Sequence, residues 1–147
     1  MEHNYALDVI HSRQIIEPSI AAFAAVNRTE EDIEKLNDNI FRLNNCSGES
    51  NELTKLDMEF HMQIAYASKN QVVPLILEPI HRLMPEIKKS VYATNDHAQE
   101  SAIEWHTKIA KEIINGDPVG ARAMMNQHLA IAEEHIRIML KAQSANQ

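Results

Sequence analysis

Asp57 and His61 form the residue pair with the clearest potential for chemistry, four positions apart in the stretch LDMEFHMQIAYASKN (residues 56–70). Such residues lie about 40° apart around an α-helix, so the carboxylate and the imidazole can chelate one ion. Phe60 and Ile64 adjoin His61 on the apolar side, which indicates that the imidazole points inward, where it needs a partner. Taken alone, the pair favours a plainer interpretation, because exposed Asp–His pairs and core histidines bonded to a backbone carbonyl are common.

Two further histidines, His106 and His128, change this balance, because each lies beside apolar residues in a later helical stretch. Each alone would be structural, but three inward-leaning histidines and one aspartate on three helices match the way that bundles build internal metal sites. One carboxylate and three imidazoles suit Zn²⁺, Ni²⁺, Mn²⁺ or Fe²⁺, and the ligand types do not choose among them, although Zn²⁺ is our first expectation. Such a site keeps a positive charge and open coordination positions, so it favours a carboxylate ligand.

Arg13 and Glu17 are also four residues apart, in a stretch rich in Ile and Ala. This spacing favours an ion pair on the helix surface. The alternative is that Arg13 reaches into a cavity and binds an acid through two parallel hydrogen bonds. The other five histidines are predicted to be structural or on the surface: His3, His11, His81, His97 and His135.

Six or seven helices must position these residues. Glycine is scarce, aromatic residues make up 5% of the chain, and alternating β-branched residues are missing, which predicts an all-α fold arranged as an antiparallel bundle. Thr29 is a predicted N-cap, Ser101 and Glu104 a predicted capping box, and Asp117 before Pro118 the strongest helix start. The expected helices cover residues 6–27, bent or broken at Pro18; 28–45; 51–69, capped by Asn70; 71–95, as a short and then a longer bent helix; 101–115; and a last helix from 118.

Length and charge limit the possible roles. A chain of 147 residues without a long linker-like stretch predicts one domain over residues 1–147. The formal net charge is −7, and without a basic patch such a surface repels a nucleic-acid backbone. The single Cys46 excludes an internal disulfide, and no apolar run approaches the roughly 20 residues of a membrane span. We therefore expect a cytoplasmic protein without a membrane partner.

Four segments, in this order, resemble the effector-binding domain of GntR-superfamily transcription regulators of the FadR C-terminal-domain (FCD) type: RQIIEPSIAAFAA, DMEFHMQIAYASKN, WHTKIAKEIINGD and ARAMMNQHL. The resemblance implies an all-α bundle, usually dimeric, that binds small organic acids and transmits the effect of this binding to DNA-binding domains. It also implies that Asp57, His61, His106 and His128 are the metal ligands. In this family a winged helix-turn-helix ordinarily precedes the domain, and nothing before Arg13 is long enough to be one. We therefore expect these residues to reach DNA only through a domain outside the chain.

The sequence thus predicts a metal-dependent sensor of a small organic acid, in a homodimeric regulator that is not an enzyme, with Arg13 as a second contact to the acid. The alternative is a helical metal-dependent hydrolase or isomerase, since a metal with an open position can activate water. That alternative lacks an obvious general base, because Glu59 lies about 200° around the helix from each ligand of the Asp57 pair. A third possibility, a helical dimerisation module without a ligand, leaves the inward histidines unexplained.

Overall fold

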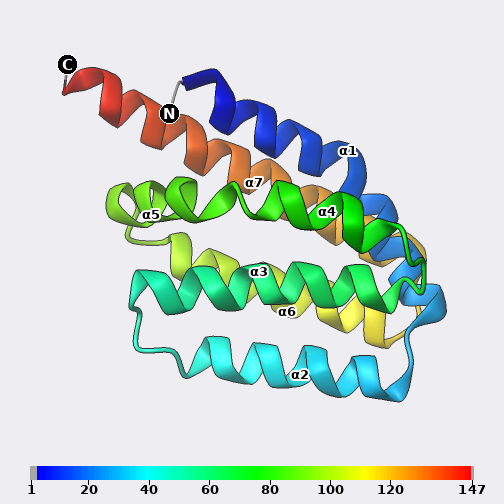
Figure 1. Cartoon of the computed structure of the whole chain (residues 1–147). Coiled ribbons are helices and arrows are strands. Elements are labelled where there is room, and N and C mark those ends of the chain that lie inside the picture. Colours follow the sequence, from blue (N-terminus) through cyan, green and yellow to red (C-terminus); the bar gives the residue numbers. More distant parts are fainter. Residues whose placement is uncertain (1–2, 147) are drawn as a thin grey trace.

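The computed structural model describes residues 3–146, which form seven α-helices and no strand. This arrangement confirms the all-α prediction and the expected number of helices (Figure 1). The helices are α1 (His3–Asn27), α2 (Glu30–Asn44), α3 (Ser50–Ala67), α4 (Val73–His81), α5 (Met84–Thr94), α6 (Ala98–Ile114) and α7 (Pro118–Ala145).

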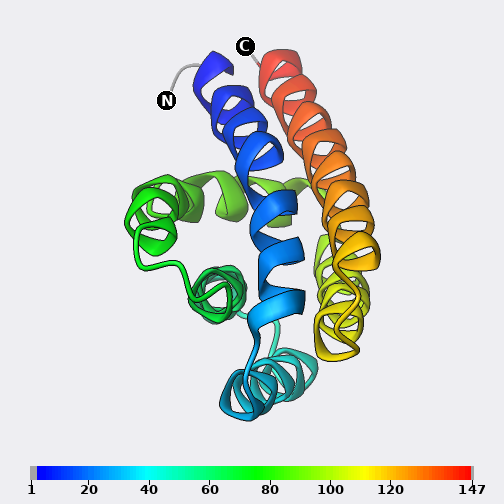
Figure 2. The same cartoon turned by 90° about the vertical axis from the view of Figure 1, so that its right-hand side faces the viewer.

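Sequence neighbours mostly run antiparallel, as short connections between packed helices require. The first and the last helix lie side by side over much of their length, and α1 begins at the end of the bundle where α7 finishes (Figures 1 and 2). In Figure 2, α1 passes between α6 and α7 on one side and α3, α4 and α5 on the other, while α2 closes the far end. The interior therefore receives side chains from six helices around α1.

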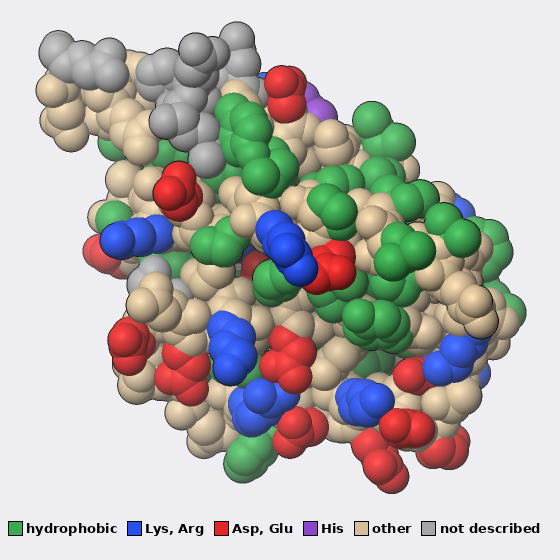
Figure 3. All heavy atoms as spheres, in the orientation of Figure 1, with side chains coloured by type: hydrophobic (Ala, Val, Ile, Leu, Met, Phe, Trp, Pro, Cys, Tyr) green, Lys and Arg blue, Asp and Glu red, His purple; other side chains and the backbone are tan. Residues whose placement is uncertain are grey.

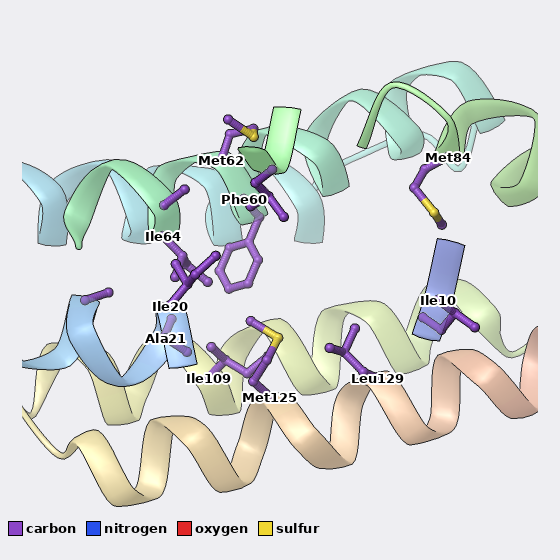
Figure 4. Close-up of a cluster of buried hydrophobic side chains, with 14 of the residues drawn as sticks. Ile10, Ile20, Ala21, Phe60, Met62, Ile64, Met84, Ile109, Met125 and Leu129 are labelled. Atoms are coloured by element: carbon purple, nitrogen blue, oxygen red, sulfur yellow. The ribbon is translucent and has the colours of Figure 1, made fainter. Parts of the chain in front are cut away.

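Most of the core between these helices is apolar, apart from the site described below and single polar side chains such as Asn39, which donates to the Leu56 carbonyl. Phe60 is fully buried and points from α3 toward Ile109 of α6 and Met125 of α7 (Figure 4). Its ring stacks on His106, with the centroids 4.1 Å apart and the planes at 10°. Phe60 thus joins the hydrophobic core to the polar cluster and limits how the His106 ring can turn.

Two predicted helix starts are confirmed. Thr29 and Asp32 form a capping box before α2, in which the Thr29 side chain accepts from the Asp32 N–H and the Asp32 side chain accepts from the Thr29 N–H. Asp117 precedes α7 and accepts from the Gly120 N–H at 3.0 Å. Each side chain satisfies backbone donors that the first turn leaves without an intrahelical partner.

Two predicted caps are wrong. The left-handed residue after α3 is Lys69, at φ 62°, whereas Asn70 accepts with Oδ1 from the N–H groups of Val72 and Val73 and so starts the next helix. Ser101 lies one turn inside α6, not at its start.

The start of α6 is instead set by Asn95, whose Oδ1 accepts from the His97 N–H at 2.9 Å. The first residue of the helix is Ala98, which is buried on the same face as Ala102. The side chain three residues before the helix therefore outweighs the capping-box pattern inside it. A third finding concerns Pro18, which was expected either to bend one helix or to separate two short ones: it lies within a single helix, α1.

On the face that Figure 3 shows, acidic and basic side chains alternate over α2 and α3, while hydrophobic side chains gather over α4, where Leu75 and Ile76 are exposed. Among the described residues, none of the helices has the length and hydrophobicity that crossing a membrane requires. This face therefore combines mixed charges over α2 and α3 with an apolar region over α4.

Candidate metal and ligand site

Six helices contribute ionisable side chains to one buried cluster near the middle of the bundle. All of them are 9% exposed or less. They are Arg13 and Glu17 from α1, Asp57 and His61 from α3, His81 from α4, Lys88 from α5, His106 from α6 and His128 from α7.

The three histidines predicted as ligands meet at one point. One ring nitrogen from each of His61, His106 and His128 lies within 4.8 Å of the other two. Asp57 adjoins them, with its Oδ1 3.0 Å from His106 Nε2 and 3.8 Å from His61 Nε2. When two ligand atoms each bind one metal ion at about 2.1 Å and the angle between the bonds is near 90°, the two atoms lie about 3.0 Å apart. The separation of Asp57 Oδ1 and His106 Nε2 has this value. The cluster can therefore hold a metal ion.

Several polar atoms of this cluster have no hydrogen-bond partner within the described part of the chain. They are Asp57 Oδ1, both ring nitrogens of His106, His128 Nε2 and, on the Glu17 side, His81 Nδ1. The 3.0 Å contact between Asp57 and His106 is thus close enough for a hydrogen bond but not aligned as one. Because buried polar atoms are rarely left without a partner, this convergence fits a group that accepts lone pairs from Asp57 Oδ1, from one nitrogen of the neutral His106 ring and from His128 Nε2, as a metal ion does.

Glu17 forms a second part of the cluster. Its Oε2 accepts from Arg13 Nε at 2.5 Å and lies 3.2 Å from His81 Nε2, while its Oε1 lies 2.5 Å from His61 Nδ1. Since Glu17 is acceptor-only when ionised, His61 carries its proton on Nδ1 and leaves Nε2 for a metal. Arg13 Nη2 lies 3.2 Å from this Nε2 and 3.4 Å from Nδ1, so the guanidinium lies against the His61 ring beside the metal cluster.

These contacts correct two predictions. The Arg13–Glu17 pair was expected on the surface, but Arg13 is 0% and Glu17 2% exposed. His81 was placed with structural or surface histidines, yet it is fully buried and stacks on His61 with centroids 5.0 Å apart. A usable signal existed in α1, because Arg13 and Glu17 share the helical stripe of the buried Ile10.

The two carboxylates are held ionised by different cations. Burial opposes ionisation of Glu17, but the adjacent Arg13 guanidinium, followed by His61, holds its pKa well below the usual range. Burial likewise opposes ionisation of Asp57, and Lys88 outweighs it, so the pKa of Asp57 is also well below its usual range. Each carboxylate therefore remains an anion in the interior.

The three histidines predicted as metal ligands are held neutral. Burial lowers the pKa of His61 to about 3, although the neighbouring Glu17 carboxylate opposes the shift. Burial also lowers the pKa of His106 and brings that of His128 well below its usual value. Neutral imidazoles have the free lone pairs that a metal ligand needs.

A small cavity adjoins the cluster between α5, α6 and α7. Its volume is about 20 Å³, which is room for about one water molecule. Lys88 and His128 stand on its wall, together with Met84, whose sulfur is 3.9 Å from Arg13 Nη1. An acid that widened this cavity would meet the Lys88 ammonium and the neutral His128 ring.

The remaining predictions for side chains have mixed outcomes. Glu59 points away from the ligand pair, as expected, and accepts from Arg42 at 2.6 Å. His11 is exposed beside Glu133, and His97 is exposed before α6. His135 is half-buried on the cavity wall. The side chain of His3 lies outside the described residues.

Comparison with known families assigns the chain to a domain family. Residues 8–131 match the FCD domain. The chain belongs to the FCD domain family. This is the effector-binding domain of GntR-family transcription regulators, so the resemblance of the four segments is confirmed.

Two curated relatives illustrate the match. The chain is 32% identical over 143 residues to the Exu regulon transcriptional regulator of Escherichia coli K12, covering 93% of the chain and 52% of the regulator. It is 25% identical over 130 residues to the HTH-type transcriptional regulator LutR of Bacillus subtilis, covering 86% and 59%. The chain thus spans about half the length of the curated relatives it matches. Both are transcriptional regulators and not enzymes, in agreement with the prediction for this FCD domain.

A solved structure shares the fold. Streptococcus agalactiae GntR superposes with a TM-score of 0.73 at 24% sequence identity, over 88% of this chain and 58% of that one. At this identity the likeness supports the helical architecture alone. The assignment of ligands must therefore come from the side chains of this FCD domain.

Proposed function

We propose that this FCD domain senses a small organic acid at a divalent metal ion held by Asp57, His61, His106 and His128. Zn²⁺ is the first candidate, and Ni²⁺, Mn²⁺ and Fe²⁺ accept the same nitrogen and oxygen donors. The metal would supply a Lewis-acidic positive charge with a position open to an anion.

The observation that carries this proposal is the convergence of unpartnered lone pairs. Ring nitrogens of His61, His106 and His128 lie within 4.8 Å of one another, and His128 Nε2 and Asp57 Oδ1 have no hydrogen bond among the described residues. Leaving such groups without a partner costs free energy. A bound ion removes that cost, because each lone pair then has a ligand bond.

Arg13 is proposed to hold the acid from the other side. Only its Nε donates to a carboxylate, whereas Nη1 faces the Met84 sulfur and Nη2 the His61 ring. A guanidinium has five N–H donors, so two of them could bind an effector carboxylate side by side. Nη1 and Nη2 are the donors proposed for this role, because neither of them contacts a carboxylate.

Acid binding would then order the helices around the cluster and change how two copies of the domain associate. We propose a homodimer, in which the response reaches DNA through a winged helix-turn-helix domain and not through these acidic helices. A cytoplasmic location follows from this role. Such a response requires that the acid bind one arrangement of helices better than another.

Metal analysis tests the first half of the proposal. The purified protein, reconstituted with Zn²⁺, should hold one equivalent, and His106→Ala and His128→Ala should each release it. His97→Ala is the matched control, because His97 is exposed and lies outside the buried cluster. A content well below one equivalent after reconstitution, with the variants indistinguishable from the control, overturns the metal site.

A thermal-shift screen of small carboxylic acids tests the second half. A ligand that binds only the folded state raises its melting temperature. We expect at least one hydroxy acid to raise it in the Zn²⁺-loaded protein, and the shift to vanish when a chelator is added or when Arg13→Met is used. An acid that shifts the metal-free protein equally would contradict binding at the metal.

A further inference from the structure

Lys88 is a buried lysine with an unusual position. It lies on α5 with 9% of its surface exposed, and its ammonium is 3.5 Å from Asp57 Oδ2. The Tyr92 ring adds a weaker contact, with its centroid 5.9 Å from the same nitrogen. Lysine is seldom buried unless it is paired, so Asp57 is the partner that holds Lys88 inside the bundle.

The two oxygens of Asp57 therefore face different groups. Oδ2 faces Lys88, whereas Oδ1 faces the histidine nitrogens and lies 3.0 Å from His106 Nε2. A metal bound through Oδ1 would place a double positive charge on the carboxylate that Lys88 now neutralises. At such short range in the interior, metal and ammonium would repel each other strongly.

Arg13 does not face the same conflict. Its charge is balanced by Glu17, which accepts from Nε at 2.5 Å and is not one of the proposed metal ligands. Once a metal binds Asp57, the Asp57 carboxylate no longer neutralises Lys88 alone, and the Lys88 ammonium lacks a counter-ion of its own. Lys88 also stands on the wall of the cavity beside His128, where an anion would enter.

We propose that Lys88 is an effector-binding residue that exchanges partners: it pairs with Asp57 in the metal-free domain and with the anionic group of the acid once the metal is bound. This inference rests on the proposed metal site. It implies that Lys88 weakens metal binding in the absence of an acid and strengthens acid binding in its presence. A lysine that served only the packing of the bundle would not act in opposite directions on the two ligands.

The test uses Lys88→Met, which keeps a long apolar side chain, with Lys89→Met as the control, because Lys89 is the exposed neighbour on the same helix. Zn²⁺ affinity is measured by competition with a chromophoric chelator. Anion binding is measured by titrating Co²⁺-loaded protein with acetate and following its visible absorption. Lys88→Arg is a second variant, which retains the charge if Lys88→Met folds poorly.

We expect Lys88→Met to raise Zn²⁺ affinity at least threefold and to weaken acetate binding at least fivefold, while Lys89→Met changes neither and Lys88→Arg stays close to the unmodified protein. If both affinities fall together, or if acetate binding is unchanged, the exchange role is refuted. If the unmodified protein takes up no Zn²⁺ or Co²⁺, the proposed metal function fails first, and this inference fails with it. The metal content of the unmodified protein therefore separates the two failures.

Discussion

The Glu17 carboxylate is the group on which the arrangement of the cluster depends most heavily. It is 2% exposed and lies within 3.2 Å of nitrogen atoms from Arg13, His61 and His81. Glu17→Gln keeps the shape of the side chain but removes its charge and replaces one acceptor by a donor. Arg13 would then remain in the core as an unpaired cation, since its nearest other contacts are a sulfur and an imidazole.

Removing one partner of a buried ion pair costs about 3–5 kcal/mol. A domain of this kind is stabilised by roughly 5–15 kcal/mol, so Glu17→Gln should remove a large share of the free energy of unfolding. The variant also loses the acceptor that orients His61 Nδ1, and changes to such outer contacts lower metal affinity about 10–100-fold. We expect both effects in the same protein.

Urea unfolding of the metal-free protein measures the first effect, and Zn²⁺ competition measures the second. The matched control is Glu133→Gln, because Glu133 pairs with Arg137 at the same four-residue spacing on the surface, where such pairs contribute about 0–1 kcal/mol. Replacing both Arg13 by Met and Glu17 by Gln should recover stability relative to Glu17→Gln, since no unpaired cation remains. A loss no larger than that of the control would refute the reasoning.

Two further perturbations test other features of the structure. Burial lowers the pKa of His61, His106 and His128 below the ordinary value of 6.5, so below that pH the unfolded chain binds more protons than the folded one. Metal-free stability should therefore fall as the pH drops below 6.5, by up to about 1.4 kcal/mol per pH unit for each histidine, and equal urea midpoints at pH 7.5 and 5.5 would contradict this. Asp117→Ala removes the side-chain acceptor at the start of α7 and should cost about 0.5–2 kcal/mol. Asp117→Asn, which keeps an acceptor oxygen, should lose less in the same assay.

The sequence predicted the ligand set better than it predicted the contacts around that set. Asp57 and His61 could be placed on one face because the stretch around them has an uninterrupted helical period. His81 could not, because prolines interrupt its segment and leave the phase of the helix undetermined. The structure shows a nine-residue helix there, with Pro79 inside it and His81 at its end.

The ion pairs were harder to predict for a different reason. An arginine and a glutamate four residues apart have the same spacing on the surface as in the core, so Arg13 and Glu17 looked like Glu133 and Arg137. Only packing against α3, α4 and α7 decides which pair loses contact with water. Lys88 belongs to the same class, because its partner Asp57 lies thirty-one positions earlier and no local pattern connects them.

The cluster contains a second possible ligand group, and its contacts indicate why one ion is expected and not two. Glu17, His61 and His81 also bring ligand atoms within 4.8 Å of one another. These atoms are already used, because both oxygens of Glu17 have partners, and one of those partners is the buried Arg13. A metal there would have to displace that guanidinium, whereas a metal beside His106 would meet lone pairs without a partner. His61 belongs to both groups, and its commitment of Nδ1 to Glu17 leaves Nε2 for the Asp57 side alone. The protein should therefore saturate at one equivalent of Zn²⁺, and tight binding of a second equivalent would show that Glu17 is a ligand and not a positioning residue.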